Sequence, residues 1–336
     1  MKEFKKVNKV FIKSNNTVSK IFNRYLYTLI PFIFLIIIYN LIWGSTNVII
    51  SLLISLTTSL ITSTTTQCII NLIKKKKEFT KIFLEDKIVS ISIIISLFSL
   101  NNSIPITIIS SIISIIASNI YKTRILSSSL YGILFIILYN QFINNIDTPL
   151  INLSNLSYIN TYDNIITPYG NIIEYILGIT KYYLSPILSI IAFIYLFHKK
   201  SIKYNIVFSY ILTFIFVMLI IGLFNDMNIW YLVFQLTTGN ILFLLIFTGV
   251  EYINTPTTEE GQIIYGIILG LITSILRFII PELSVVIPFI IGPLLLTKLL
   301  NKISYKLKYN RVYYYSIITI CIVSVIISTI IINIIL

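Results

Sequence analysis

The sequence predicts an all-α, polytopic membrane protein with about ten or eleven spans, and its composition carries that prediction. Hydrophobic residues make up 57% of the 336 residues, and charged residues make up only 11%. Soluble domains carry about 25% charged residues, and a soluble chain of this size has too little interior to bury so much apolar surface. A soluble enzyme is therefore excluded, as is intrinsic disorder, which requires low hydrophobicity.

Eleven apolar segments follow one another along the chain, and runs of about 20 apolar residues are typical of transmembrane helices. They cover residues 25–43, 46–73, 88–101, 104–121, 128–146, 182–197, 204–223, 228–249, 262–280, 283–300 and 313–336. The third is short enough to be tilted, re-entrant or tightly paired with the fourth. We expect five regions: a basic N-terminus (1–24), a first membrane bundle (25–146), an outer loop (147–181), a second bundle (182–300), and a basic loop with an extra final span (301–336).

The distribution of basic residues predicts the orientation, because cytoplasmic loops are enriched in Lys and Arg. If the N-terminus is cytoplasmic, all of the 25 basic residues except Lys181 and Arg277 fall on the cytoplasmic side. If the number of spans were wrong, the basic residues would not separate in this way between the two sides of the membrane. The net charge of +13 is then explained by orientation and by anionic lipid headgroups, so nucleic acid is not expected as a partner.

Two loops stand out from the rest. Residues 147–181 form the only long outer loop, and they are polar, with Asp147, Asp163 and Glu174. Long loops in compact proteins are usually functional or disordered. The inner loop 250–261, VEYINTPTTEEG, is acidic and Thr-rich on an otherwise basic side. We expect it to be ordered and packed at a helix junction or against a partner, with threonine hydroxyls capping helices.

Side chains that often carry chemistry are few. His198, the only histidine, adjoins Lys199 at a helix end and is interpreted as an interfacial residue. Cys68 and Cys321 lie in apolar segments with no metal-ligand spacing, and they are interpreted as helix-packing residues. No catalytic motif or metal site is predicted. Gly266 and Gly270 form a GxxxG pattern, which permits close helix packing.

Ionisable residues inside spans would mark an ion path, but the spans are nearly free of acids. Asp226, Glu251 and Glu282 lie near predicted helix ends. Arg277 lies near the outer end of its span, where we expect it to snorkel to the interface. Hydroxyls are numerous, as between Ser51 and Thr66, and we expect them to bond one another and the backbone.

The stretch from Thr237 to Gly270, TTGNILFLLIFTGVEYINTPTTEEGQIIYGIILG, resembles the RnfD membrane protein of the Rnf/Rsx electron-transport complex. That family is related to the NqrB protein of the sodium-pumping NADH:quinone reductase. Its members carry a segment close to ATDPVTSPTTxxGQ, of which TPTTEEGQ is kept here, with Glu251 in place of the aspartate. The end of the next helix also resembles the family, because it has Leu276 and Arg277 followed by Pro281 and Glu282. The resemblance covers about residues 14–305.

Other family features have changed, in keeping with a composition that indicates an AT-rich bacterial genome. The family's NPFNPA-like segment after the fourth helix reads KTRILSSSLYG (122–132) here, without its prolines and most of its glycines. A weaker match links Glu85 and Asp86, followed by an apolar run to Pro105, to the family's DGSA…LSIPP segment. The final span, 313–336, lies beyond the usual family end.

The resemblance implies a cofactor, because the family carries FMN bound covalently through its phosphate to a threonine of the outer loop. That threonine follows a small-Gly-Ala motif and usually precedes proline. Thr167, followed by Pro168, is the matching position, so the resemblance makes Thr167 the phosphoryl-FMN threonine. Ile165 and Ile166 replace the glycine and alanine, and β-branched residues crowd the approach of an attaching enzyme.

The resemblance therefore implies a multi-pass subunit of the bacterial inner membrane that takes part in electron transport coupled to cation translocation. Its expected partners are the other subunits of the Rnf/Rsx-type complex, a flavin-attaching enzyme and the lipid membrane; it is not expected to be an enzyme by itself. Two alternatives stay open. One is a cofactor-free secondary transporter, which inverted repeats with broken helices would support. The other is a family relic that has lost its flavin and serves only in assembly.

The orientation can be tested with reporter fusions. Fusions after Lys77, Arg124, Lys200 and Lys308 are expected to report the cytoplasm, because basic loops stay inside. Fusions within residues 150–175 are expected to report the outer side. A basic loop that reports the outer side would refute the eleven-span arrangement.

Overall fold

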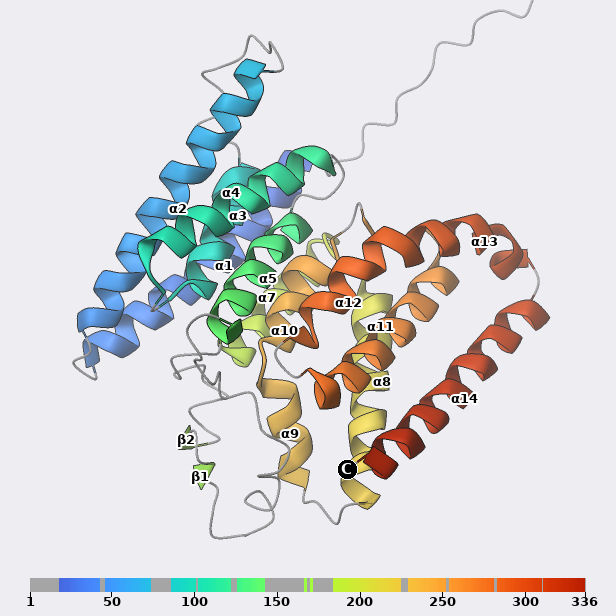
Figure 1. Ribbon diagram of the computed structural model, residues 1–336. Coiled ribbons are helices and arrows are strands. Elements are labelled where there is room, and N and C mark those ends of the chain that lie inside the picture. The colour runs from blue at the N-terminus through green and yellow to red at the C-terminus, as the bar shows by residue number, and fades with distance from the viewer. Residues whose placement is uncertain are drawn as a thin grey trace, which may run out of the picture.

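The protein is a bundle of helices in a computed structural model (Figure 1). The structure describes residues 18–42, 46–73, 86–100, 102–121, 126–142, 166–167, 170–171, 184–224, 229–251, 254–280, 283–309 and 311–335. Apart from one two-stranded hairpin, the regular elements of these residues are helical. The prediction of an all-α, multi-pass membrane protein is therefore confirmed.

The described residues of the first part of the chain form five α-helices. They are α1 (Val18–Ile42), α2 (Thr46–Ile73), α3 (Asp86–Phe98), α4 (Ile104–Ile120) and α5 (Ser129–Phe142), the last preceded by a short 3-10 turn, η1 (Leu126–Ser128). Helix α4 packs against α2 and α5, and α3 packs against α1 and α2. The hairpin strands β1 (Ile166–Thr167) and β2 (Gly170–Asn171) follow.

The second part begins with α7 (Pro186–His198) and α8 (Tyr204–Phe224) and continues with a span in two pieces, α9 (Ile229–Thr237) and α10 (Ile241–Leu244). A π-helical segment, η3 (Leu245–Gly249), extends α10. Then come α11 (Glu259–Ile279), α12 (Val286–Ile291), the π-helical η6 (Gly292–Leu296), α13 (Thr297–Tyr309) and α14 (Arg311–Ile335). Helix α14, the extra final span, packs against α8, α11 and α13.

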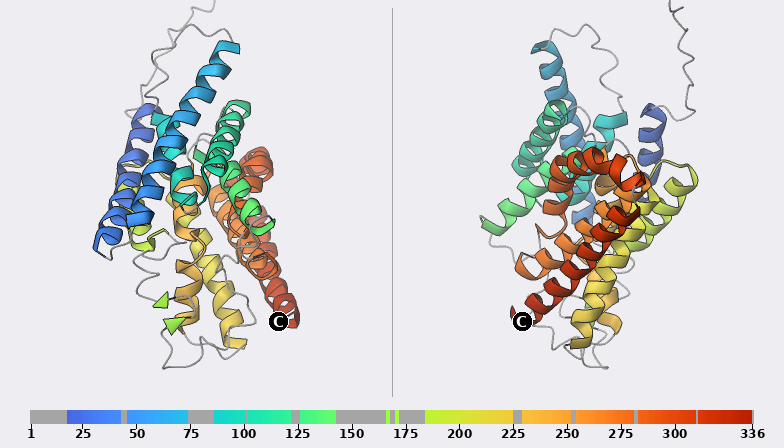
Figure 2. Two further views of the ribbon diagram at one scale, coloured as in Figure 1. Left: turned by 60° about the vertical axis from the view of Figure 1, so that its left-hand side comes forward. Right: turned by 90° about the vertical axis from the view of Figure 1, so that its right-hand side faces the viewer.

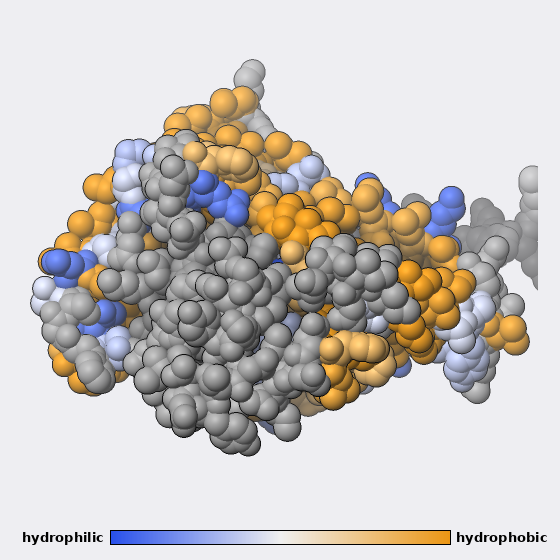
Figure 3. Space-filling view, turned by 60° about the horizontal axis from the view of Figure 1, so that its bottom comes forward, coloured by the Kyte–Doolittle hydropathy of each residue, from blue (hydrophilic) through white to orange (hydrophobic). Residues whose placement is uncertain are grey.

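Each of the eleven predicted apolar segments contains a described helix or helix pair, but their lengths differ. Within the described residues, five helices are long and apolar enough to cross a membrane, and the bent pair α9–α10 makes a sixth if it is counted as one span. Shorter apolar helices of 10–17 residues lie at Lys87–Phe98, Ile104–Ile120, Leu126–Phe142, Pro186–His198 and Tyr314–Ser324. Figure 3 shows hydrophobic residues exposed on the face that it draws. Exposed large hydrophobic side chains include Ile61 of α2 and Leu212 of α8, as lipid contact requires.

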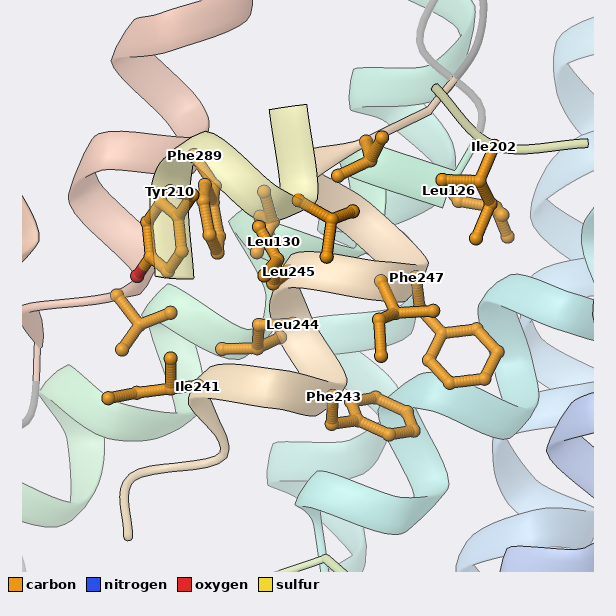
Figure 4. Packing of buried hydrophobic residues seen from close by; sticks show 14 of the residues in the cluster. Leu126, Leu130, Ile202, Tyr210, Ile241, Phe243, Leu244, Leu245, Phe247 and Phe289 are labelled. Atoms are coloured by element: carbon orange, nitrogen blue, oxygen red, sulfur yellow. The ribbon is translucent and has the colours of Figure 1, made fainter. Parts of the chain in front are cut away.

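The core is centred on the second piece of the broken span. Phe243, Leu244 and Phe247 are almost completely buried, and they contact both halves of the chain (Figure 4). Phe247 packs on Phe32 of α1, with ring centroids 5.9 Å apart. Figure 4 shows Phe289 close to Tyr210, at a ring distance of 5.6 Å. The α10–η3 segment therefore joins the two predicted bundles through buried aromatic contacts.

Hydroxyl groups connect α2 to α4 inside this helical layer. Thr58 bonds Thr107 at 3.2 Å, and Thr62 bonds Ser111. Most hydroxyls of α2 also donate to carbonyls three or four residues earlier on the same helix, as Thr57 does. The expectation that Ser and Thr satisfy one another and the backbone is confirmed, and such bonding makes polar side chains compatible with lipid.

The GxxxG pattern holds α11 against α8. A Cβ on Gly266 would overlap Ser209, and a Cβ on Gly270 would overlap Thr213 and lie 2.9 Å from the carbonyl oxygen of Tyr210. Small residues allow two backbones to approach in this way. The motif therefore acts within the chain, between two of its own helices.

Replacing Gly270 with Val is expected to destabilise the protein by about 1–3 kcal/mol, since overpacking a tight interface forces backbone shifts. Thermal unfolding of the purified protein in detergent measures this effect. The control is Leu223→Ala on α8, a side chain that is 71% exposed. A Gly270→Val protein that unfolds at the wild-type temperature would show that α8 and α11 do not pack this closely.

Candidate functional site

The family-like loop after η3 lies where several loops meet, and we call this meeting point the loop junction. Its central residues are Glu251, Asn254, Thr255, Pro256 and Thr257. Of these, only Thr257 is exposed. The loop junction contacts segments that are far away in sequence.

Glu251 is a buried carboxylate, 3% exposed, with donors on both oxygens. Its Oε1 accepts from the backbone N–H of Leu126 at 3.1 Å. Its Oε2 accepts from the backbone N–H of Ser127 at 3.1 Å, from the Ser127 hydroxyl at 2.8 Å and from the Asn254 amide at 2.7 Å. Leu126 and Ser127 open the η1–α5 helical stretch, where backbone N–H groups lack helical partners. The carboxylate thus accepts hydrogen bonds from the free N–H groups at that helix start. These hydrogen bonds compensate for the free energy lost when the carboxylate is removed from water.

A second contact binds the loop junction to the turn before α8. The Lys203 ammonium donates to the carbonyl oxygens of Thr255 and Pro256, at 3.1 and 3.0 Å. Burial lowers the pKa of Lys203 to about 8, which still leaves the side chain mainly protonated at neutral pH. The lysine therefore bridges two consecutive carbonyls of the loop junction.

The threonines of the loop junction fix the start of α11. The Thr258 hydroxyl accepts from the backbone N–H of Gly261 at 3.3 Å, which makes Thr258 the N-cap. The backbone N–H of Thr257 donates to Asn301 of α13 at 3.1 Å. The expectation of an ordered loop, packed at a helix junction and capping a helix, is confirmed for residues 251 and 254–262. Tyr252 and Ile253 lie outside the described residues.

These contacts also test the span alternation. The N-terminal part of α1 reaches the turn between α7 and α8, because Arg24 donates to the carbonyl oxygen of Lys199 at 2.8 Å and to Ser201 at 2.9 Å. With the contacts of Glu251, Lys203 and Thr257, this brings together five segments that are predicted to lie on one side of the membrane. They are the start of α1, the start of the η1–α5 stretch, the α7–α8 turn, the loop junction and α13. Figure 1 shows the β-hairpin and the C-terminal end of α14 at the opposite end. Which end faces the cytoplasm stays a prediction.

The expectation that Arg277 snorkels to the interface is wrong. Arg277 is 3% exposed, and its guanidinium donates to Gln235 at 3.0 Å and to the Thr238 hydroxyl. A Cβ on Gly239 would overlap the guanidinium, and the positive φ of this residue also favours glycine. The arginine faces inward because α9 ends beside it and offers side-chain acceptors. The charge is therefore buried in the protein at the break of a span.

The break itself has an unusual backbone. Gly239 and Asn240 have positive φ angles of 72° and 57°, and the two helical pieces meet at 47°. The Asn240 side chain accepts from the backbone N–H of Leu184 at 2.7 Å, and Leu184 is where the described chain resumes after the outer loop. The end of the predicted outer loop is therefore fastened to the break. Sequence reasoning missed this contact.

Thr167, the predicted FMN threonine, lies in the β-hairpin. Its backbone pairs with Gly170, and it is the last residue of β1. Its side chain, Pro168 and Ile165 lie outside the described residues, as does the rest of the loop 147–181 except Ile166 and the second strand. Flavin attachment at Thr167 stays a prediction.

The remaining candidates have plain roles. His198 is exposed at the end of α7, and its position at the membrane interface stays a prediction. Cys68 is partly buried and packs beside Ile88, Ile91 and their neighbours, as expected of an apolar helix residue. The side chain of Cys321 lies outside the described residues. In the described part of the chain, His, Cys, Asp and Glu do not form a group of three that could hold a metal.

Replacing Glu251 with Gln is expected to destabilise the protein by about 2–3 kcal/mol, because the amide would turn an N–H group toward donors. Glu259→Gln is the matched control, since that carboxylate is exposed in the first turn of α11 and such a charge contributes less than about 1 kcal/mol. Thermal unfolding in detergent compares the two. Equal unfolding temperatures would mean that the buried carboxylate does not hold the loops.

Comparison with known proteins gives a family match and matches to curated relatives. Residues 6–291 match the family described as "NQR2, RnfD, RnfE family". The D component of an "Ion-translocating oxidoreductase complex" from Methanosarcina acetivorans is 34% identical over 94 residues, which are 28% of this chain and 30% of the relative. The D component of a "Na(+)-translocating ferredoxin:NAD(+) oxidoreductase complex" from Acetobacterium woodii is 32% identical over 94 residues, 28% of this chain and 27% of the relative.

The aligned part thus spans less than a third of each of these two curated relatives. The family match is much longer. It includes the loop junction, the broken span and the β-hairpin, and it ends before η6, α13 and α14. By this match over most of its length, the chain belongs to the NQR2, RnfD, RnfE family.

Proposed function

We propose that this protein is a membrane subunit of an ion-translocating oxidoreductase complex, in which electron transfer is coupled to cation movement across the membrane. The observation that carries the proposal is the family match over residues 6–291. The Methanosarcina and Acetobacterium relatives are both named as components of such complexes. Within the match, the TPTTEEGQ segment is kept, and its described residues pack at the loop junction.

We further propose that the protein carries one FMN, bound through its phosphate to the Thr167 hydroxyl. Two lines of reasoning support this. The residue resembles the family's attachment threonine and precedes proline, and the positive-inside rule independently predicts an outer position for the loop. The flavin would supply one- and two-electron redox chemistry, while the protein supplies attachment and orientation.

The chain's own residues would position that loop. The backbone pairing of Thr167 with Gly170 keeps the attachment residue in a short hairpin. At its C-terminal end, the loop is fastened by the Leu184–Asn240 hydrogen bond, and Asn240 follows the glycine beside Arg277. The loop junction, at the other end of the molecule, would hold the helices in register and offer contacts to other subunits.

The partners we propose are the other membrane subunits of a complex of this type and an enzyme that attaches flavin. The location we propose is the bacterial inner membrane. The long apolar helices require a bilayer, and a partner is expected because the chain has no motif of a standalone enzyme.

One observation favours the alternative of a cofactor-free transporter. The span α9–α10 is broken and bent by 47°, and discontinuous helices often build transport sites. The family match weighs against this alternative, because the family's named members belong to oxidoreductase complexes. Purification separates the two functions: a yellow, partner-bound subunit fits the complex, and a colourless single chain fits the transporter.

The flavin site is tested by fluorescence of the denatured protein in a gel under ultraviolet light. A covalent flavin survives denaturation, so wild-type protein made together with its attaching enzyme is expected to give a fluorescent band. Thr167→Val keeps the side-chain shape but removes the hydroxyl, so the band is expected to go dark while membrane insertion continues. Thr161→Val and Thr180→Val are the controls and are expected to stay fluorescent.

Two outcomes would contradict this assignment in different ways. A fluorescent Thr167→Val protein would mean that flavin is attached to another residue. A wild-type protein that never fluoresces, yet still purifies with its partners, would mean that the chain has lost its flavin and serves in assembly.

A further inference from the structure

The turn between α7 and α8 is held in one conformation. Lys200 has a left-handed backbone, with φ of 52°. Its N–H donates to the carbonyl oxygen of Phe197, and the N–H of Ser201 donates to that of Leu196, both at 2.9 Å. This pair of bonds is the Schellman arrangement that closes a helix end. The residues of the turn therefore have fixed positions.

Helix α1 fastens the same turn from the side. The Arg24 guanidinium donates to the Lys199 carbonyl oxygen and to the Ser201 hydroxyl. The side chains of His198, Lys199 and Lys200 are exposed. The right-hand view of Figure 2 shows the α7–α8 turn at the edge of the molecule, near the end of α1. Two lysine charges are thus presented outward from a braced turn.

Four aromatic rings lie next to this turn and contact one another in a closed cycle. Phe193 and Phe197 belong to α7, and Tyr204 and Phe208 belong to α8. The ring centroids are 6.0 Å apart for Phe193–Phe197, 5.4 Å for Phe197–Tyr204, 6.4 Å for Tyr204–Phe208 and 5.8 Å for Phe208–Phe193. Three of the rings are exposed, and Phe193 is half-buried. Tyrosine is enriched at the level of lipid headgroups, which is where Tyr204 would lie, and the three phenylalanine rings continue the apolar surface.

An apolar surface continues along both helices from the aromatic cycle. Ile190 and Ile194 of α7 and Leu212 and Phe216 of α8 are exposed. From Tyr204 to Phe216 the helix rises about 18 Å, at 1.5 Å per residue. One leaflet of a bilayer has a hydrocarbon layer of about 15 Å, half of the full core. The apolar surface is therefore long enough for the acyl chains of one leaflet.

We propose that this surface is a binding site for one anionic phospholipid, with the phosphate at Lys199 and Lys200 and the acyl chains along α7 and α8. Charge complementarity selects the occupant. The two lysines lie at the end of the apolar surface where a headgroup phosphate would lie, and juxtamembrane lysines attract anionic lipid. The closed aromatic cycle would contact the glycerol region and the upper acyl chains.

The test uses the purified full-length protein in neutral detergent. Binding of a short-chain phosphatidylglycerol is compared with that of a phosphatidylcholine of equal chain length and with that of glycerol 3-phosphate, by titration with native mass spectrometry. The wild type is expected to bind phosphatidylglycerol more tightly than phosphatidylcholine. Glycerol 3-phosphate is expected not to compete at the same concentrations.

The double variant Lys199→Gln, Lys200→Gln is expected to bind phosphatidylglycerol about 25-fold more weakly, since each lysine near an anionic surface contributes about 1 kcal/mol. Binding of phosphatidylcholine is expected to stay unchanged. The matched control is Lys298→Gln, Lys302→Gln, two exposed lysines of α13, and it is expected to keep the wild-type preference. If the first variant does not fold, Lys199→Gln with Lys200→Asn replaces it, because Asn tolerates a left-handed backbone.

A third variant distinguishes a site that binds a whole phospholipid from a site that binds only the phosphate of the headgroup. Phe197→Ala with Phe208→Ala is expected to weaken both phospholipids, because it removes the aromatic contact. Several results would overturn the proposal: equal binding of both lipids by the wild type, equal loss in the α13 control, or displacement of the lipid by glycerol 3-phosphate. A further result would assign the surface to another protein of the complex. In that case the other protein, with no lipid bound, would protect Lys199 and Lys200 from chemical acetylation. None of these results depends on flavin.

Discussion

The buried carboxylate of Glu251 is the interaction on which the arrangement of this protein depends. It follows the π-helical η3 segment by two residues, and it binds the start of the η1–α5 helical stretch, more than a hundred residues earlier in the chain. A buried charge is tolerated only when donors surround it. Because two of those donors are the backbone N–H groups of Leu126 and Ser127, the start of α5 cannot move without exposing the charge. The other contacts of the loop junction, from Lys203, Thr257 and Asn301, extend the same constraint to α8, α11 and α13.

The second constraint comes from the bilayer, where backbone groups must be satisfied within the protein. The chain meets it at the broken span by surrounding the break with side chains. Asn240 accepts from Leu184, and Thr238 and Gln235 accept from Arg277. The break costs helical hydrogen bonds, and it positions a fixed positive charge beside Gly239. It also fastens the end of the loop that contains Thr167, so the two ends of the molecule are each organised around one charged residue.

The sequence predicted the helices well because their signals are local. Apolar runs locate α1, α2, α8 and α11, and the lysines predicted which loops share a side, an expectation with which the Arg24, Lys203 and Glu251 contacts agree. The sequence did not predict the partners of Glu251, since backbone N–H groups leave no residue-type signal. It placed Arg277 wrongly because snorkelling assumes a lipid neighbour, whereas the neighbour here is the end of α9. The 122–132 segment departs from the family's NPFNPA-like pattern, and two of the donors to Glu251 are backbone N–H groups of that segment. Attachment of flavin at Thr167 requires an attaching enzyme as well as the threonine hydroxyl, so it stays a prediction.

The coupling between Glu251 and Ser127 tests most directly whether a buried charge holds the two parts of the chain together. A double-mutant cycle with Glu251→Gln, Ser127→Ala and the double variant measures it, with unfolding free energies obtained in detergent. Residues that share a hydrogen-bond network are expected to show an interaction energy of about 0.5–3 kcal/mol. We expect a value in the upper half of that range, because the serine hydroxyl and the carboxylate are both buried. Effects that add to within about 0.5 kcal/mol would show that the carboxylate and the start of the η1–α5 stretch are independent, and would contradict this account.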